Sequence, residues 1–240
     1  HQSNRGLVAA RQTAIAAATG DYVIHCDADD WVDADYYEKL RDVALSTDAD
    51  IVCSGCTLDF PSGRSKIIRP IVISTPDELV LAMTQKLKYS SLVVKLVRRD
   101  IAVRASLDIP LELDMGEDLL RSVSMLNISQ VVATCECKGY HYVQNPSSMC
   151  RTLNQDRLNQ FIRVVELLTS KYGIDRNQTV ELRKQVLSMA LKYRCLSIRE
   201  FRRYRASVRE SFLNPIKNFD NFESKRKTIK GKLKAAIYLV

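Results

Sequence analysis

The sequence lacks the glycine-rich motifs with which many proteins hold phosphate groups. Only 8 of its 240 residues are glycine, and neither G-x-G-x-x-G nor the Walker pattern G-x-x-x-x-G-K-[S/T] occurs. With 3 histidines, the chain offers little material for a Ser-His-Asp triad. No apolar run approaches the roughly 18 residues of a membrane-spanning helix. Any phosphate-binding or catalytic site must therefore be built from other residues.

The 7 cysteines are odd in number and scattered, which is typical of a reducing compartment. Cys53 and Cys56 form a C-x-x-C pattern, with Cys135 and Cys137 as candidate partners in a zinc site. If residues 53–56 form a strand, however, the odd spacing places the first two thiols on opposite faces. A zinc site is therefore the less favoured interpretation.

Charge is distributed unevenly along the chain. Residues 1–150 carry 15 Lys and Arg against 20 Asp and Glu, a net charge of −5. Residues 151–240 carry 21 against 8, a net charge of +13. This asymmetry predicts two parts, an acidic catalytic body over residues 1–150 and a basic helical appendage over residues 151–240. A hydrophobic fraction of 46% is enough to form the cores of one or two domains.

The most informative stretch is an apolar run followed at once by carboxylates. Residues 22–26 predict a short buried strand, and Asp27, Asp29 and Asp30 follow directly. Carboxylates this close repel one another unless water disperses them or a cation holds them. Ligands bind at the carboxyl ends of strands in open α/β sheets, and hard oxygen ligands suit Mg²⁺ or Mn²⁺. The stretch therefore predicts a metal–diphosphate site.

Two other interpretations of the same residues are open. An EF-hand loop beginning at Asp27 has an acid at its first, third, ninth and twelfth positions, but Trp31 stands at the fifth and Val32 replaces the glycine at the sixth. Alternatively, the acids form a solvated turn that precedes a helix over residues 34–45, with Asp33 as its N-cap. The N-cap role suits Asp33 and Asp35 better than Asp27 and Asp29.

The remaining hydrophobic patterns predict an α/β body followed by helices. Helices are predicted over residues 7–18, 75–86 and 117–126. Strands are predicted over residues 50–54, 92–97, 131–134 and 140–142, with a hairpin within 57–70. From residue 153 onward the pattern predicts helices only, the first ending near Gly173 and the next two spanning 180–196 and 198–212.

Five segments, in order, resemble the family 2 glycosyltransferases of the GT-A fold. Matches in the right order across residues 4–148 are far more specific than a single Asp-x-Asp. The matching segments are Asn4-Arg5-Gly6 with Ala10-Arg11, Ala18 to Val23 continuing into Asp27 to Trp31, Lys95 to Arg99, Met115 to Leu120, and Tyr140-His141-Tyr142 with Ser147-Ser148.

The resemblance implies the transfer of a sugar from a nucleotide-diphosphate sugar to an acceptor hydroxyl, with inversion at the anomeric carbon. It places the divalent metal, Mg²⁺ or Mn²⁺, on Asp29 and Asp27. It assigns donor binding to five residues, of which Asp27 contacts the nucleotide or its ribose. Those five are Asn4, Arg11, Asp27, Ala28 and Asp29.

The resemblance also assigns the general base that takes the acceptor's proton to Asp118, with Glu117 beside it. The alternative for this pair is structural, because acids at a helix N-terminus favour the helix dipole. His141 is open to two interpretations as well, a contact with the diphosphate or, preferably, a hydrogen-bonded structural histidine.

The family begins with a nucleotide-binding half that has no counterpart before His1. We therefore expect a partial GT-A sheet with an exposed edge and flanking helices, followed by the C-terminal helical region. Expected partners are a nucleotide-sugar donor and a saccharide or lipid-linked acceptor, in bacterial surface polysaccharide or glycolipid synthesis. The expected location is cytoplasmic, with peripheral attachment to the inner face of the membrane through the basic segment 225–240.

Two functions from other classes compete with this one. The basic C-terminal part would suit a nucleic-acid-binding or membrane-binding module, but no aromatic stacking platform or reader motif supports the binding of nucleic acid. A non-catalytic member of the same family is the other alternative.

Overall fold

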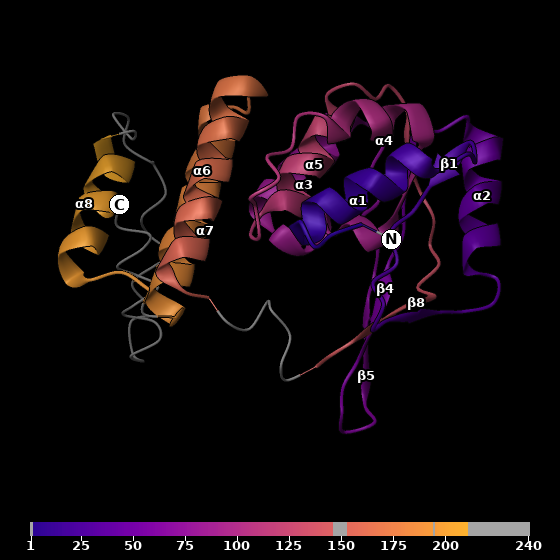
Figure 1. The fold of residues 1–240 in the computed structure, drawn as a ribbon, viewed down its shortest axis with the longest axis horizontal. Helices are drawn as coiled ribbons and strands as arrows, with labels where there is room; N and C mark the ends of the chain where they lie inside the picture. The colour runs from indigo at the N-terminus through magenta and orange to yellow at the C-terminus, as the bar shows by residue number, and fades with distance from the viewer. Residues whose placement is uncertain (1, 146–152, 194, 211–240) are drawn as a thin grey trace, which may run out of the picture. The chain divides into compact units, whose positions relative to one another are not determined.

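The structure is a computed structural model that describes residues 2–145, 153–193 and 195–210. The chain divides into two compact units, His1–Thr152 and Leu153–Val240. The predicted membrane-binding segment 225–240 lies outside the described residues. The first unit combines strands with helices and the second is helical, which confirms the predicted α/β class with a helical C-terminal region (Figure 1).

The first unit contains two four-stranded sheets. The first sheet has the order β1-β6-β3-β7, and only the β3–β7 pair is parallel. Its strands are β1 (Tyr22–Val23), β6 (Lys95–Arg98), β3 (Ile51–Cys53) and β7 (Val132–Thr134). The second sheet has the order β2-β8-β4-β5, and only the β8–β4 pair is parallel. Its strands are β2 (Trp31–Val32), β8 (Tyr140–Val143), β4 (Cys56–Asp59) and β5 (Ser65–Ile68).

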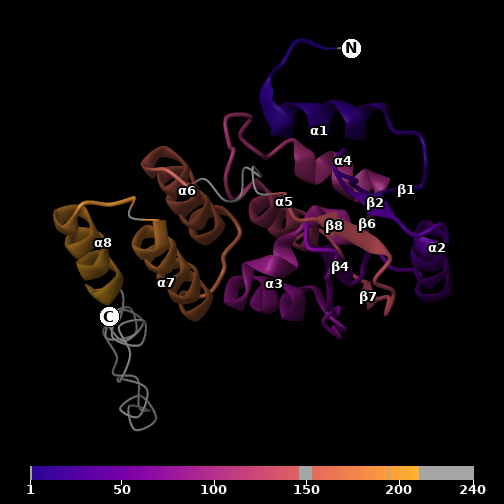
Figure 2. The same cartoon turned by 90° about the horizontal axis from the view of Figure 1, so that it is seen from below.

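Helices cover both sides of these strands. Helix α2 lies on one side, with α3 and α5 on the other and α1 packed against α4 (Figures 1 and 2). A core cluster that includes Tyr36, Leu40, Val52 and Tyr140 fills the space between α2 and the sheets. The helices of this unit are α1 (Gly6–Ala17), α2 (Tyr36–Thr47), α3 (Pro76–Gln85), α4 (Arg99–Ser106) and α5 (Glu117–Leu126), with 3-10 turns η1 (Leu87–Ser90) and η2 (Leu92–Val94).

Several predicted elements have different bounds in the structure. The predicted strand 22–26 pairs only at Tyr22 and Val23, which are half-buried rather than buried. The predicted strand 92–97 begins as a 3-10 turn. The short helix α4 was not predicted. The hairpin within 57–70 and the helix 117–126 are confirmed.

The prediction for the chain after the acidic turn is wrong in two respects. Trp31 and Val32 form strand β2 rather than a loop, because they pair with His141 and Tyr140. Helix α2 therefore begins two residues later than predicted, and its N-cap residue is Asp35, which makes no side-chain capping bond. Asp33 is not the cap, since its carboxylate faces His141 instead.

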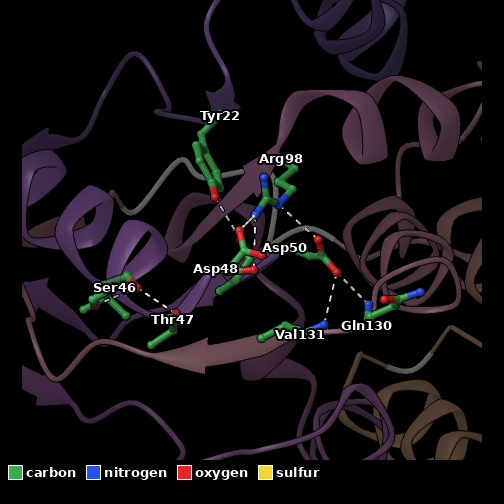
Figure 3. A network of polar contacts seen from close by, with 10 residues as sticks. Tyr22, Ser46, Thr47, Asp48, Asp50, Arg98, Gln130 and Val131 are labelled. Carbon is green, nitrogen blue, oxygen red and sulfur yellow. Dashed lines mark hydrogen bonds and ion pairs between the residues drawn. The ribbon is translucent and has the colours of Figure 1, made fainter.

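One end of the first sheet is held together by Asp50, the residue before β3 (Figure 3). Its Oδ2 accepts backbone hydrogen bonds from Gln130 at 2.6 Å and Val131 at 3.1 Å. Its Oδ1 lies 3.1 Å from Nε of Arg98, at the end of β6. The guanidinium of Arg98 also pairs with Asp48 and lies over the ring of Tyr22. One carboxylate thus links the starts of β3 and β7 to the end of β6.

The second unit contains helices α6 (Gln155–Lys171), α7 (Arg176–Tyr193) and α8 (Ile198–Glu210). Asn154 caps α6 by accepting a hydrogen bond from the backbone of Arg157, and Asp175 does the same for Gln178 at the start of α7. The buried faces of α6 and α7 pack together through side chains that include Phe161, Leu168 and Val186.

Replacing Asp50 with alanine should destabilise the first unit by about 2–4 kcal/mol, because two backbone N–H groups and the Arg98 guanidinium lose their acceptor. Chemical denaturation of the purified chain measures the change. Asp48→Asn is the matched control, since its side chain is 93% exposed and its ion pair with Arg98 should contribute less than about 1 kcal/mol. Equal effects from the two variants would contradict the role given to Asp50.

Candidate active site

The acidic stretch is a tight turn between β1 and β2. The backbone N–H of Asp30 donates to the carbonyl of Asp27 at 3.1 Å, which closes the turn around Ala28 and Asp29. The carboxylate of Asp30 is engaged, because it accepts hydrogen bonds from the Tyr140 hydroxyl at 2.6 Å and the Val143 backbone at 2.8 Å. Asp30 therefore anchors the turn to β8.

The anchor leaves the other two carboxylates of the turn at the surface. Asp29 is exposed, and the side chain of Asp27 is 37% exposed. The Tyr140 hydroxyl also accepts a hydrogen bond from the backbone of Asp27 at 3.2 Å. Burial, followed by the hydrogen bond to Asp30, raises the pKa of Tyr140, so its proton stays in place to hold the turn.

Arg11 joins the turn to the start of α5. One guanidinium nitrogen lies 2.7 Å from Oδ1 of Asp118 and 3.6 Å from Oε1 of Glu117, and the other lies 3.3 Å from Oδ1 of Asp27. Arg11 is 8% exposed, so these contacts are largely shielded from water. Carboxylates 90 residues apart in the sequence therefore share one cation. We call Arg11, Asp27, Glu117 and Asp118 the charged cluster.

Helix α1 is held in place beside α4, and this fixes Arg11. The side-chain amide of Gln12 donates to the carbonyls of Ser106 at 2.7 Å and Ile109 at 3.2 Å, which lie at the end of α4 and just beyond it. Arg11 precedes Gln12 on the same helix. The two Gln12 hydrogen bonds therefore also hold the backbone of Arg11 in position.

Glu117 and Asp118 lie in the first turn of α5, after Gly116 in a left-handed conformation with φ of 83°. Acids at this position favour the helix dipole, as the structural interpretation requires. The same two carboxylates also contact Arg11, so the start of α5 contributes both of them to the charged cluster. Placing them at a helix start fixes their direction relative to Asp27.

Two further residues adjoin the charged cluster and were missed by sequence reasoning. Burial and then the charges of Arg11 and Arg121 lower the pKa of His25 to about 3. Burial and then the charge of Arg11 lower the pKa of Arg121 to about 10, against the opposing charges of Asp118 and Glu117. The signal for Arg121 was available, because it is the one cation inside the otherwise apolar or small stretch 119–126.

Arg11, at the centre of the charged cluster, stays protonated. Burial alone would lower the pKa of Arg11, but the charges of Asp118, Asp27 and Glu117 together outweigh it and raise the pKa. Of the other predicted donor-binding residues, Ala28 is exposed within the turn. Asn4 is exposed too, and its side-chain oxygen accepts a hydrogen bond from the backbone of Gly6 at 3.0 Å, at the start of α1.

His141 lies apart from the charged cluster, between two carboxylates. Its Nδ1 is 2.8 Å from Asp59 and its Nε2 is 3.3 Å from Asp33, while its ring stacks on Trp31 with centroids 3.5 Å apart. Because both ring nitrogens already face acceptors, the structure favours the structural interpretation of His141. A cavity of about 500 Å³ beside it is lined by Asp33, Lys39 and His141 among others, and by no residue of the charged cluster.

The carboxylates of the turn fit a hard divalent cation. Asp27 and Asp29 supply two oxygen donors at an exposed turn, and Mg²⁺ commonly binds through one or two carboxylates together with substrate phosphates. Within residues 2–145, 153–193 and 195–210, no group of three or more His, Cys, Asp or Glu is placed to hold a metal ion. A cation here would therefore need oxygen atoms from a ligand, and the described cysteines form no such group either.

Comparison with solved structures defines the class of the fold. The chain is similar to Staphylococcus aureus TarS (residues 1–349) with a TM-score of 0.60 and 14% identity, over 86% of this chain and 60% of that one. The same protein in complex with UDP-GlcNAc gives a TM-score of 0.57 at 13% identity, over 83% of this chain and 59% of that one. The chain therefore shares the GT-A fold of that glycosyltransferase, followed by a helical C-terminal region.

Sequence comparison identifies the family. Residues 1–101 match the family model described as Glycosyl transferase family 2. Two Bacillus subtilis (strain 168) proteins are similar. "Uncharacterized glycosyltransferase EpsJ" is 28% identical over 62% of this chain and 45% of its own length. "Putative glycosyltransferase EpsH" is 26% identical over 78% of this chain and 55% of its own length. The chain thus spans about half the length of these relatives. The match to glycosyltransferase family 2 covers the first part of the chain, residues 1–101.

Replacing His141 with alanine should destabilise the first unit by about 1–3 kcal/mol, through loss of the stacked ring, of the hydrogen bond with Asp59 and of the contact with Asp33. Affinity for UDP, measured by calorimetry, should change by less than about threefold, because His141 has no nitrogen free for a diphosphate. Trp31→Ala removes the stacking and the Trp31 hydrogen bond to Asp59 but keeps the contacts of His141 with Asp59 and Asp33, and it should cost less stability. A large loss of UDP affinity in His141→Ala with unchanged stability would contradict the structural role.

Proposed function

We propose that the protein transfers a sugar from a nucleotide-diphosphate sugar to an acceptor hydroxyl, with inversion. The observation that carries the proposal is the charged cluster, in which Arg11 brings the carboxylate of the acidic turn to the carboxylates at the start of α5. Donor binding and proton removal are the two tasks of such a transfer, and the cluster supports both at one place. The complex of TarS with UDP-GlcNAc supports a nucleotide-sugar as the donor class.

The donor side of the proposed site is the acidic turn with Arg11. A divalent cation, when bound there, neutralises charge on the departing diphosphate. Arg11 is a permanent cation next to Asp27, so it can pair with diphosphate oxygens once the donor is present. The turn is anchored through Asp30 and Tyr140 before any ligand binds, which limits the reorganisation that the donor must impose.

The acceptor side of the proposed site is the start of α5. Asp118 is the proposed base, because its side chain is 28% exposed and can reach an acceptor hydroxyl, whereas that of Glu117 is 14% exposed. While Asp118 is paired with Arg11, its Oδ1 is occupied by a hydrogen bond from the guanidinium at 2.7 Å. Transfer of Arg11 to the diphosphate would therefore make the base available only when the donor is bound. Inversion follows if the acceptor oxygen displaces the diphosphate in one step.

The proposed acceptor is a saccharide or a lipid-linked sugar in bacterial surface polysaccharide or glycolipid synthesis, reached from the cytoplasmic face of the membrane. No helix among the described residues is long and apolar enough to cross a bilayer. Helix α8 supports peripheral contact with anionic lipid, since Phe201 and Tyr204 pack towards Leu187 while Arg202 and Arg203 are exposed.

Asp29→Ala should lower sugar transfer by about 10²-fold or more while leaving the fold intact, because it removes one oxygen ligand for the divalent cation. Activity with and without chelator and the rise in Tm on adding Mn²⁺ and UDP provide two independent measurements. Asp42→Ala is the matched control, being a 61% exposed acid on α2. Full activity of Asp29→Ala, or of the unmodified protein in excess chelator, would refute the metal role.

Asp118→Asn keeps the size of the side chain but cannot accept a proton, so transfer should fall by about 10²–10⁴-fold. Donor affinity should change by less than about tenfold, because Arg11 retains Asp27 and Glu117 as partners. Glu117→Gln is the control and should cost less activity. If donor affinity falls in step with the rate, Asp118 belongs to the donor site and is not the base.

A further inference from the structure

Arg121 is a buried cation without a hydrogen-bonding partner. It is 1% exposed, and Nε and both terminal nitrogens of its guanidinium have no hydrogen bond within the described residues. An unpaired buried polar group is costly, and a buried charge much more so. Native proteins retain such a group where another state of the molecule uses it.

The neighbours of Arg121 on its own helix show what could pair with it. Glu117 and Asp118 precede it by four and three residues on α5, the two spacings at which side chains meet along a helix. An acid four residues before a basic residue is also the more favourable order. Both carboxylates already contact Arg11, at 3.6 Å and 2.7 Å respectively. Two arginines therefore compete for one pair of carboxylates, and Arg11 holds them.

We infer that Arg121 is a positioning residue that takes over Glu117 and Asp118 when Arg11 leaves them. The inference rests on the proposed function, because the donor's diphosphate is the ligand that draws Arg11 away. Without a second cation, that departure would leave two carboxylates at the start of α5 repelling each other. With Arg121 one turn along the same helix, Glu117 is held in place and Asp118 keeps its direction towards the acceptor.

Lys95 shows that this chain can supply hydrogen-bond acceptors to a buried cation. It is 2% exposed, and its Nζ donates to the carbonyls of Tyr89 at 2.7 Å and Ser91 at 2.6 Å. These bonds tie the 3-10 turns η1 and η2 to strand β6. Arg121 has no comparable bonds, although it is as deeply buried. The contrast indicates that Arg121 is kept for an interaction that this state of the protein does not make.

A double-mutant cycle on the purified chain tests the inference without donor, metal or acceptor. In the unmodified background, Arg121→Met should raise Tm by about 2–4 °C, because it removes a buried charge that makes no hydrogen bond within the described residues, while keeping an apolar stem. In the Arg11→Met background, the same replacement should lower Tm, because Arg121 is then the remaining partner of Glu117 and Asp118. Arg121→Lys should lower Tm less than Arg121→Met in that background, since it keeps the charge.

Lys95→Met is the control for removing a buried cation. The hydrogen-bond partners of Lys95 are the backbone carbonyls of Tyr89 and Ser91, and the charge of Asp118 is its one link to the cluster, so the two backgrounds should differ less for Lys95→Met than for Arg121→Met. Additive effects of Arg11→Met and Arg121→Met would overturn the inference. So would a large loss of Tm from Arg121→Met in the unmodified background.

A second measurement separates this inference from the proposed function. The Nε–H signal of Arg121 in nitrogen-15 spectra, assigned by its loss in Arg121→Lys, should shift in the same direction on adding UDP with Mg²⁺ as it does in Arg11→Met. Coupling in the thermal cycle without a response to UDP would leave the exchange of partners standing but overturn the donor as its trigger, and the proposed function with it. Binding of UDP with additive thermal effects would support the proposed function and overturn the role of Arg121.

Discussion

A single buried arginine is the constraint on which the candidate site depends. Asp27, Glu117 and Asp118 come from two distant segments, and like charges cannot gather in a partly buried place without a counter-charge. Arg11 supplies it, and the Gln12 contacts with the end of α4 fix the helix from which it extends. The packing of two helices therefore decides the distance between the proposed donor site and the proposed base.

The acidic turn is fixed from its other side by β8. Tyr140 and Val143 donate hydrogen bonds to the two carboxylate oxygens of Asp30. This carboxylate therefore has a structural role in the turn. The carboxylates of Asp27 and Asp29 stay accessible to solvent, because Asp30 is the residue that anchors the turn to β8. The stacked pair of Trp31 and His141 continues the same β2–β8 contact. Thus the second sheet, which supplies no member of the charged cluster, still determines where the turn lies.

The helices and most strands of the first unit could be predicted, because their apolar spacing and their Gly, Pro and Thr boundaries are local signals. Thr75 with Pro76, and Gly116 before Glu117, mark helix starts in this way. The GT-A fold came from ordered motifs, and the comparisons confirm it. Strand β2 could not be predicted, because two residues become a strand only when β8, over 100 residues later, pairs with them.

The members of the site were predicted more completely than their contacts. Arg11, Asp27, Glu117 and Asp118 were all selected from motifs, yet no motif indicates that Arg11 bridges the other three. That arrangement depends on how α1 packs beside α4, which is a long-range property. The use of Asp30 as an anchor was invisible for the same reason. Roles of the individual site residues remain predictions that the experiments above can test.

The buried cations of the first unit differ in how their hydrogen-bonding groups are satisfied. Lys95 is satisfied by two backbone carbonyls and stabilises the segment around it. Arg11 has more acidic partners than it can bind equally well, and Arg121 on the neighbouring helix has no hydrogen-bonded partner within the described residues. An arrangement selected for stability alone would divide the carboxylates between the two arginines. The inferred role of Arg121 accounts for the difference, since Arg121 gives the two carboxylates a second partner once a negatively charged ligand engages Arg11.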